Sequence, residues 1–174
     1  TPDGREGWSD IFLRAGHSVF LVDQPRRGEA GQTATGPVDT LAGDQAWYTH
    51  FRIGRIAPEL YENSQFPEGD EAQNQFFRQM TPNTGDYDQA VIADAMNAVL
   101  QKVYDMTGKD AILVTHSQGG LVGWDVALDH VTAIVAIEPG FAPTEEMMPA
   151  EWDKFMTAEE KVPIIFYYGD NIDN

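Results

Sequence analysis

Apolar residues along the chain alternate between helical spacing and short uninterrupted runs. A short helix is expected over residues 8–14. Apolar residues at three-and-four spacing from Val91 to Tyr104 predict a longer helix that ends at Gly108. A further helical pattern runs from Gly120 to about His130. Helices are therefore expected between the apolar runs.

The apolar runs predict buried β-strands. They lie at residues 18–22, 111–114, 133–137 and 164–168. The run at 111–114 lacks polar alternation, which is typical of a strand buried on both faces. Because strands that alternate with helices form parallel sheets, the expected fold class is α/β, with a mostly parallel sheet and flanking helices.

The segment from Gln32 to Asp86 has poor periodicity but many aromatic residues. It is too long for a plain connection and too aromatic for a disordered linker. We expect residues 32–86 to form a cap-like insertion within a single domain that covers residues 1–174. Its aromatic side chains could line an apolar pocket, form a small core of the insertion, or do both.

Charge excludes some classes of partner. The chain of 174 residues carries 28 acidic and 11 basic residues, for a formal net charge of −17. This balance repels nucleic acid and anionic membrane surfaces. No apolar run approaches the ~20 residues of a membrane-spanning helix. The expected partner is a small molecule, and the sequence does not indicate an oligomeric state.

The sequence predicts no cofactor and no metal site. The absence of Cys excludes a thiolate metal site and a cysteine nucleophile. The acidic stretch from Glu145 to Glu160 lacks the dense, glycine-containing spacing of a calcium loop, so a solvated loop and helix are expected there. Neither a phosphate-binding glycine loop nor a dinucleotide fingerprint occurs.

A serine lies on the turn between the predicted strand at 111–114 and the helix that follows it. The local sequence is Thr115-His116-Ser117-Gln118-Gly119. A nucleophile elbow places a serine on such a turn, with its hydroxyl above the carboxyl edge of the sheet. Gly119 supplies the small residue that lets the helix pass close to the strand, whereas Thr115 departs from the G-x-S-x-G pattern. The N–H of Gln118 would face a developing oxyanion.

The sequence resembles small bacterial serine esterases of the α/β-hydrolase superfamily whose triad acid is glutamate. The resemblance covers nearly the whole chain. It rests on Thr1-Pro2-Asp3-Gly4-Arg5, Gly7-Trp8, Phe12-Leu13-Arg14, Val22-Asp23-Gln24, Gln65-Phe66-Pro67, His116-Ser117-Gln118, Ala133-Ile134-Val135 and Glu138-Pro139-Gly140. It implies ester hydrolysis by a Ser-His-Glu triad, with Ser117 as nucleophile and Glu138 as the acid, and it favours secretion.

The position of Glu138 also allows this role on physical grounds. Glu138 follows the strand next along the chain after the strand that precedes Ser117, so both should emerge at the carboxyl edge of the sheet. The alternative acid is Asp170, just beyond the following strand, where many α/β hydrolases carry theirs.

None of the four histidines, His17, His50, His116 and His130, is well placed to serve as the base. His17 and His130 should lie toward the amino edge of the sheet, with His130 at a helix end, and the side chain of His116 should diverge from that of Ser117. His50, in the insertion, could approach the pocket. In the superfamily the histidine follows the last strand, so the base is expected after Asn174.

The resembling enzymes also have a third strand, which lies between the strands that match 18–22 and 111–114 and whose loop supplies a second oxyanion N–H. This strand is expected before Thr1, and the chain is expected to be an internal portion of a longer hydrolase that lacks the first strands and the last strand. Two other functions stay open: another acyl or C–X hydrolase on the same scaffold, and a non-catalytic binding protein.

Overall fold

The computed structural model describes residues 6–31, 43–80, 85–156 and 162–169. The chain divides into two compact units, an N-terminal unit of residues 1–84 and a C-terminal unit of residues 85–174, and each is described by itself. The prediction of one partial domain with an insertion at 32–86 stays a prediction.

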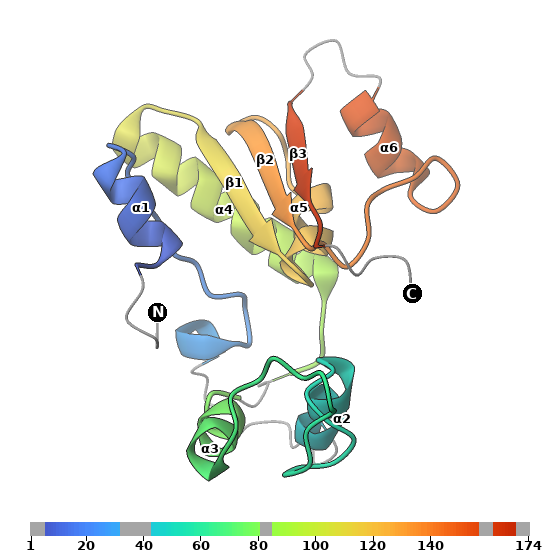
Figure 1. Cartoon of the computed structure of the whole chain (residues 1–174). Helices are drawn as coiled ribbons and strands as arrows, with labels where there is room; N and C mark the ends of the chain where they lie inside the picture. Colours follow the sequence, from blue (N-terminus) through green and yellow to red (C-terminus); the bar gives the residue numbers. More distant parts are fainter. Residues whose placement is uncertain (1–5, 32–42, 81–84, 157–161, 170–174) are drawn as a thin grey trace. The chain divides into compact units, whose positions relative to one another are not determined.

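The C-terminal unit contains a parallel sheet of three strands in the order β1-β2-β3 (Figure 1). The strands are β1 (Ala111–His116), β2 (Val131–Ile137) and β3 (Ile164–Tyr167). In the register, His116 pairs with Ile137, and Ile137 pairs with Tyr167. The last residues of the three strands are therefore aligned, and whatever follows each strand emerges at one edge. The expected parallel α/β architecture is confirmed.

Three helices accompany the sheet among the described residues of this unit: α4 (Gln89–Thr107), α5 (Gly119–Asp125) and α6 (Pro149–Met156). The predicted long helix is confirmed as α4. Asp88 caps its start by accepting the Val91 N–H, and Gly108 ends it in the left-handed conformation that glycine favours, with φ 65°.

One face of the sheet is covered by the main core. Leu113 and Ile134, which face each other in the register, are buried on this side, together with Trp124 of α5 and Phe155 of α6. The opposite face is open within the described part of the unit, where Ile112 is 55% exposed and Ile165 52% exposed. The expectation that 111–114 is buried on both faces is therefore wrong, because no described element of the unit covers the second face.

Helix α5 is shorter than predicted. It ends at Asp125 because Val126 adopts an extended conformation, with φ −62° and ψ 147°. The following N–H, that of Ala127, then donates to the side chain of Asn97 at 2.8 Å instead of continuing the helix. His130 therefore lies in the connection to β2 and not at a helix end.

The N-terminal unit is a small helical assembly in its described part. Its elements are α1 (Trp8–Arg14), the 3-10 helix η1 (Gly28–Gly31), α2 (Gly43–His50) and α3 (Asp70–Arg78). Tyr48, Ile53 and Phe76 form a buried core, with Phe66 and Phe77 packed against it. The predicted helix at 8–14 is confirmed, and the aromatic residues of 43–80 do form a core of their own.

The predicted strand at 18–22 is not formed. Residues 17–24 have no regular secondary structure, and Leu21 is 83% exposed. An extended apolar run becomes a strand only when a neighbouring strand satisfies its backbone groups, and none of the described residues does so here.

None of the described helices combines the length and the apolar character that a membrane span needs.

Candidate active site

Ser117 occupies a strained turn directly between β1 and α5. Its φ is 52°, in a region that residues with a side chain rarely adopt. The side chain is exposed at the carboxyl end of the sheet. A serine held at positive φ between a strand and a helix is the local geometry of a nucleophile elbow.

Hydrogen bonds join this turn to β2 and to the loop that follows β2. The Ser117 N–H donates to the carbonyl of Ile137 at 3.1 Å. The Ser117 carbonyl accepts the N–H of Gly120 at 2.9 Å and that of Gly140 at 3.1 Å. Both sides of the turn are thus fixed by backbone contacts, and the Ser117 side chain takes part in neither.

Glu138 is the second strained residue at this edge. Its φ is 43°, and it directly follows β2 as Ser117 follows β1. The Glu138 N–H donates to Tyr167 at 2.8 Å, and its carboxylate Oε1 accepts the Gly169 N–H at 2.5 Å. Because His116 and Ile137 pair in the register, Ser117 and Glu138 leave neighbouring strands at the same level.

The loop after Glu138 packs tightly against α5. A methyl group on Gly120 would lie 2.6 Å from the Cβ of Pro139, closer than real carbon atoms approach. The indole N–H of the fully buried Trp124 donates to the carbonyl of Phe141 at 2.9 Å. The sequence singled out Gly119 for a close approach. The sequence does not predict that Gly120 and Trp124 contact the loop after Glu138, because that loop lies about 20 residues further along the chain.

Thr115 fits at the first position of the elbow because the helix opposite it carries a glycine. The Thr115 side chain is buried, and its Oγ1 has no hydrogen-bond partner among the described residues. A methyl group on Gly123 would lie 3.1 Å from the Thr115 methyl carbon. The departure from G-x-S-x-G therefore leaves the close contact of strand and helix intact.

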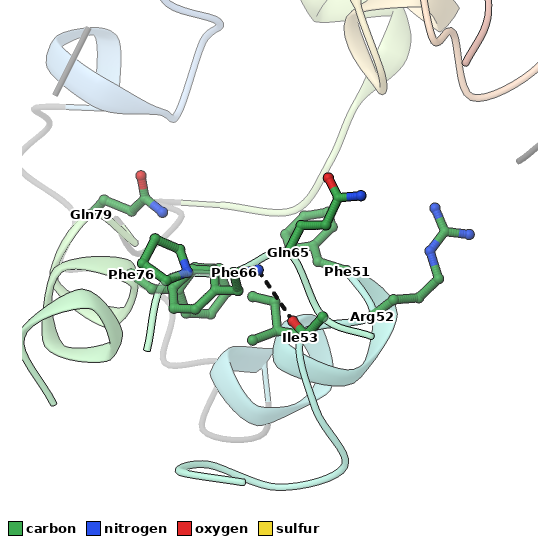
Figure 2. A pocket seen from close by; sticks show the side chains of 9 residues that line it. Phe51, Arg52, Ile53, Gln65, Phe66, Phe76 and Gln79 are labelled. Atoms are coloured by element: carbon green, nitrogen blue, oxygen red, sulfur yellow. Dashed lines mark hydrogen bonds between the residues drawn. The ribbon is translucent and has the colours of Figure 1, made fainter. Parts of the chain in front are cut away.

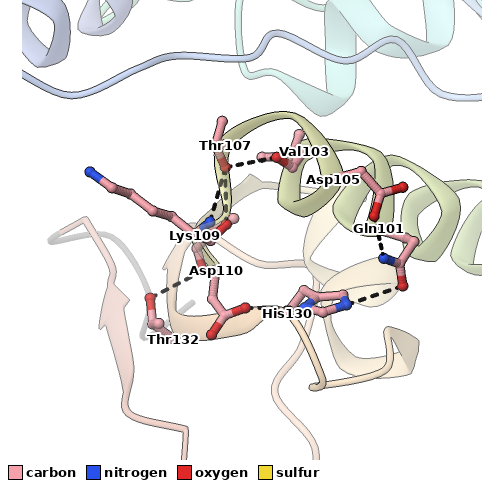
Figure 3. Close-up of polar contacts among 9 residues, drawn as sticks. Gln101, Val103, Asp105, Thr107, Lys109, Asp110, His130 and Thr132 are labelled. Carbon is pink, nitrogen blue, oxygen red and sulfur yellow. Dashed lines mark hydrogen bonds and ion pairs between the residues drawn. The ribbon is translucent and has the colours of Figure 1, made fainter.

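His130 lies at the amino edge of the sheet, as expected from the sequence. Figure 3 shows its ring between Asp110 and Gln101, each 3.1 Å from one ring nitrogen. The ring also stacks on Tyr104, with the centroids 4.2 Å apart. Its carbonyl accepts the N–H of Ala111, the first residue of β1. His130 is thus a structural residue at the end of the sheet opposite Ser117.

The other histidines are described within their own units, and the expectation that His50 could approach the pocket stays a prediction. His116 is the last residue of β1 and is exposed. His17 and His50 belong to the N-terminal unit, where His17 contacts Phe12 and the Nδ1 of His50 lies 2.7 Å from the carbonyl of Ala46. Asp170, the alternative acid, lies outside the described residues.

Gln118 directly precedes α5 and already has helical dihedral angles, φ −57° and ψ −30°, immediately after the strained serine. The described residues contain no group of acidic or histidine side chains that could hold a metal ion.

The N-terminal unit contains a shallow hollow of about 480 Å³ (Figure 2). Three aromatic residues, Phe51, Phe66 and Phe76, line it beside the polar side chains of Arg52 and Gln65. Phe66 donates its backbone N–H to the hydroxyl of Ser64 at 3.3 Å, which fixes the Gln65-Phe66-Pro67 stretch. Both expected uses of the aromatic residues, a core and a hollow, are therefore present in residues 43–80.

Comparison with known proteins decides the family. Residues 1–170 match the model of the alpha/beta hydrolase family. The chain belongs to the alpha/beta hydrolase family. This hydrolase is also similar to a protein named "Probable secreted lipase phiG" from a fungal species (strain ATCC 74256). The two are 28% identical over 165 residues, which cover 86% of this chain and 43% of the fungal protein.

The hydrolase is similar in structure to a bacterial esterase solved at atomic resolution. The TM-score is 0.70 and the identity 27%, and the match covers 99% of this chain and 55% of the esterase. The chain thus spans about half the length of the relatives it matches.

Proposed function

We propose that the protein hydrolyses carboxylic esters through an acyl-enzyme on Ser117. The observation that carries the proposal is the positive φ of Ser117 on a strand-to-helix turn, beside a second strained residue with a carboxylate. Backbone strain of this kind costs roughly 1–3 kcal/mol per residue and persists where function requires it. The similarity to an esterase and to a lipase supports ester substrates.

The proposed reaction first acylates Ser117 and then hydrolyses the acyl-enzyme. The Ser117 Oγ attacks the ester carbonyl carbon while a histidine takes its proton, and the Gln118 N–H donates to the oxyanion that develops. The alcohol then leaves with the proton from the histidine. Water, deprotonated by the same histidine, attacks the acyl group and releases the acid and free Ser117.

Glu138 accepts a hydrogen bond from the imidazole in this proposal and so orients it. We assign the imidazole to a histidine expected after Asn174. We assign the second oxyanion donor to a loop expected before Thr1. Residues 32–86 act as a cap, supported by the separate core around Tyr48 and by the hollow beside Phe51, Phe66 and Phe76. The name of the fungal relative supports secretion.

Labelling with a fluorophosphonate, which reacts with activated serines, tests the function. In the protein as encoded, with any residues that flank these 174, we expect labelling at neutral pH and turnover of 4-nitrophenyl esters. Ser117→Ala should lose both, with a fall in kcat of at least about 10³-fold. Ser18→Ala, a change at an exposed serine of the N-terminal unit, is the matched control and should keep both.

Two results would favour the other functions. If the folded protein is not labelled at neutral pH, it is a binding protein that lacks serine chemistry. If Ser117 is labelled but no ester is turned over, another acyl or C–X substrate class applies. Comparison of Glu138→Ala with Asp170→Ala distinguishes the two candidate acids, because only loss of the true acid should lower kcat strongly.

A further inference from the structure

The carboxylate of Glu138 is held by the chain that follows the neighbouring strand. Its Oε1 accepts the N–H of Gly169 at 2.5 Å, which is shorter than the usual N–H···O range of about 2.7–3.2 Å. Gly169 comes two residues after the end of β3. Because Ile137 pairs with Tyr167, Gly169 emerges beside Glu138 at the carboxyl edge of the sheet.

The main chain of Glu138 is fixed from the same segment. Its N–H donates to the carbonyl of Tyr167 at 2.8 Å. The segment from Tyr167 to Gly169 therefore holds both the backbone and the side chain of Glu138. An exposed glutamate would otherwise be free to sample several rotamers about its three side-chain torsions.

A side chain at position 169 would meet the Glu138 carboxylate. A Cβ there would lie 2.7 Å from the Glu138 Oε1, which is shorter than real Cβ contacts. Because Oε1 is the end of a flexible side chain, the carboxylate, and not the Gly169 backbone, would give way. A methyl group at this position should therefore move the carboxylate from its observed place.

We infer that Gly169 is a positioning residue that fixes the Glu138 carboxylate for the catalytic imidazole. The inference rests on the proposed function of Glu138. One carboxylate oxygen is occupied by the Gly169 N–H, which leaves Oε2 to accept the hydrogen bond from the imidazole. A glutamate has one more rotatable bond than the aspartate common in this role, and the bond from Gly169 removes that freedom.

The first test is Gly169→Ala in the protein as encoded. The methyl group displaces the carboxylate, so kcat per fluorophosphonate-titrated site should fall roughly 10- to 100-fold, the loss typical of a misplaced catalytic group. KM should change little, because Gly169 acts only through the Glu138 carboxylate in this inference. Gly7→Ala is the matched control, since a methyl there meets only ordinary contacts of 3.6 Å or more, and it should leave kcat unchanged.

A double-mutant cycle separates positioning from a general structural role. If Gly169 acts through the carboxylate, Gly169→Ala should have almost no further effect on kcat in a Glu138→Ala background. Equal losses in both backgrounds would overturn the inference, as would full activity of Gly169→Ala. Full activity of Glu138→Ala would instead overturn the acid assignment itself, which is a different result.

An isosteric change keeps the inference testable if Gly169→Ala does not fold. Incorporation of glycolic acid at position 169 by nonsense suppression replaces the N–H with an ester oxygen and adds no atom that could clash. We expect kcat per titrated site to fall at unchanged KM. Unchanged kcat in this variant would show that the hydrogen bond does not position Glu138.

Discussion

Ser117 and Glu138 share an unfavourable backbone geometry that the rest of the structure must hold in place. Their φ values are 52° and 43°, and each follows a strand of the same sheet. The bonds from Gly140 to the Ser117 carbonyl and from Glu138 to Tyr167 supply part of that support. Both residues are thus retained at some cost to stability, as expected where chemistry needs a particular side-chain position.

This strain predicts that two variants of Ser117 differ in stability. Ser117→Ala keeps a Cβ at positive φ, whereas Ser117→Gly removes it, so the glycine variant should be more stable by about 1 kcal/mol. Urea denaturation of both variants in the same background measures the difference. Ser18→Gly and Ser18→Ala, at a position outside the left-handed region, provide the matched pair and should favour alanine.

An equal or lower stability for Ser117→Gly would mean that the turn is not strained.

The sequence located the candidate residues but not the contacts that support them. Glu138 could be found because it directly follows the apolar run at 133–137, and Ser117 because it lies on the turn just beyond the run at 111–114. The register confirms that they leave paired strands. The bond from Gly169 joins residues 31 positions apart, and only the paired strands reveal it. The fit of Thr115 against Gly123 depends on the path of α5, which no local pattern encodes.

At the scale of elements, α5 is tied to its surroundings at its far end. The Lys154 ammonium of α6 donates to the carbonyls of Trp124 at 2.5 Å and Val126 at 2.8 Å, which the helix leaves unpaired. Burial lowers the pKa of Lys154, while the nearby charges of Asp125 and Glu151 oppose that shift. The helix that follows the Ser117 turn is therefore held at its far end by a half-buried cation.

Gly120 and Gly123 of α5 each lie close to a neighbouring residue, and alanine at the two positions should change stability to different extents. In a helix, alanine is favoured over glycine by about 1 kcal/mol. At Gly123 the new methyl meets Thr115 at 3.1 Å, so this gain should nearly offset the crowding. At Gly120 the methyl meets Pro139 at 2.6 Å and must displace the loop that follows Glu138, so both stability and kcat should fall.

Thermal unfolding and ester turnover of Gly120→Ala and Gly123→Ala check this order. A larger loss of stability and turnover for Gly123→Ala would contradict it. That result would show that the contact with Thr115 yields less readily than the contact with the loop after Glu138.

Periodicity predicted some elements correctly and failed where tertiary contacts decide. Helix α4 was predicted because its apolar spacing and its stop at Gly108 are local signals. The run at 18–22 was predicted as a strand, but a strand needs a partner, and none of the described residues pairs with it. The end of α5 was missed because Asn97, from another helix, takes the Ala127 N–H.

At the scale of the whole molecule, the charge should select among esters. These 174 residues carry a formal net charge of −17, so their field should repel anionic substrates and leave neutral ones unaffected. Salt screens this field, since the Debye length falls from about 30 Å at 0.01 M to about 8 Å at 0.15 M. The ratio of kcat/KM for an anionic ester to that for a neutral ester of the same alcohol should therefore rise with ionic strength.

A hemisuccinate and an acetate of one alcohol, assayed across this range of salt, form the matched pair. A ratio that falls with salt would reveal a local cationic subsite that outweighs the net charge.

The open face of the sheet makes the stability of the C-terminal unit depend on what binds it. Ile112 and Ile165 present apolar surface to solvent, and β1 has a free edge among the described residues. Any segment or molecule that covers this face only in the folded state stabilises the fold by mass action. A covering group of this kind would therefore make the measured free energy of unfolding depend on the concentration and the affinity of that group.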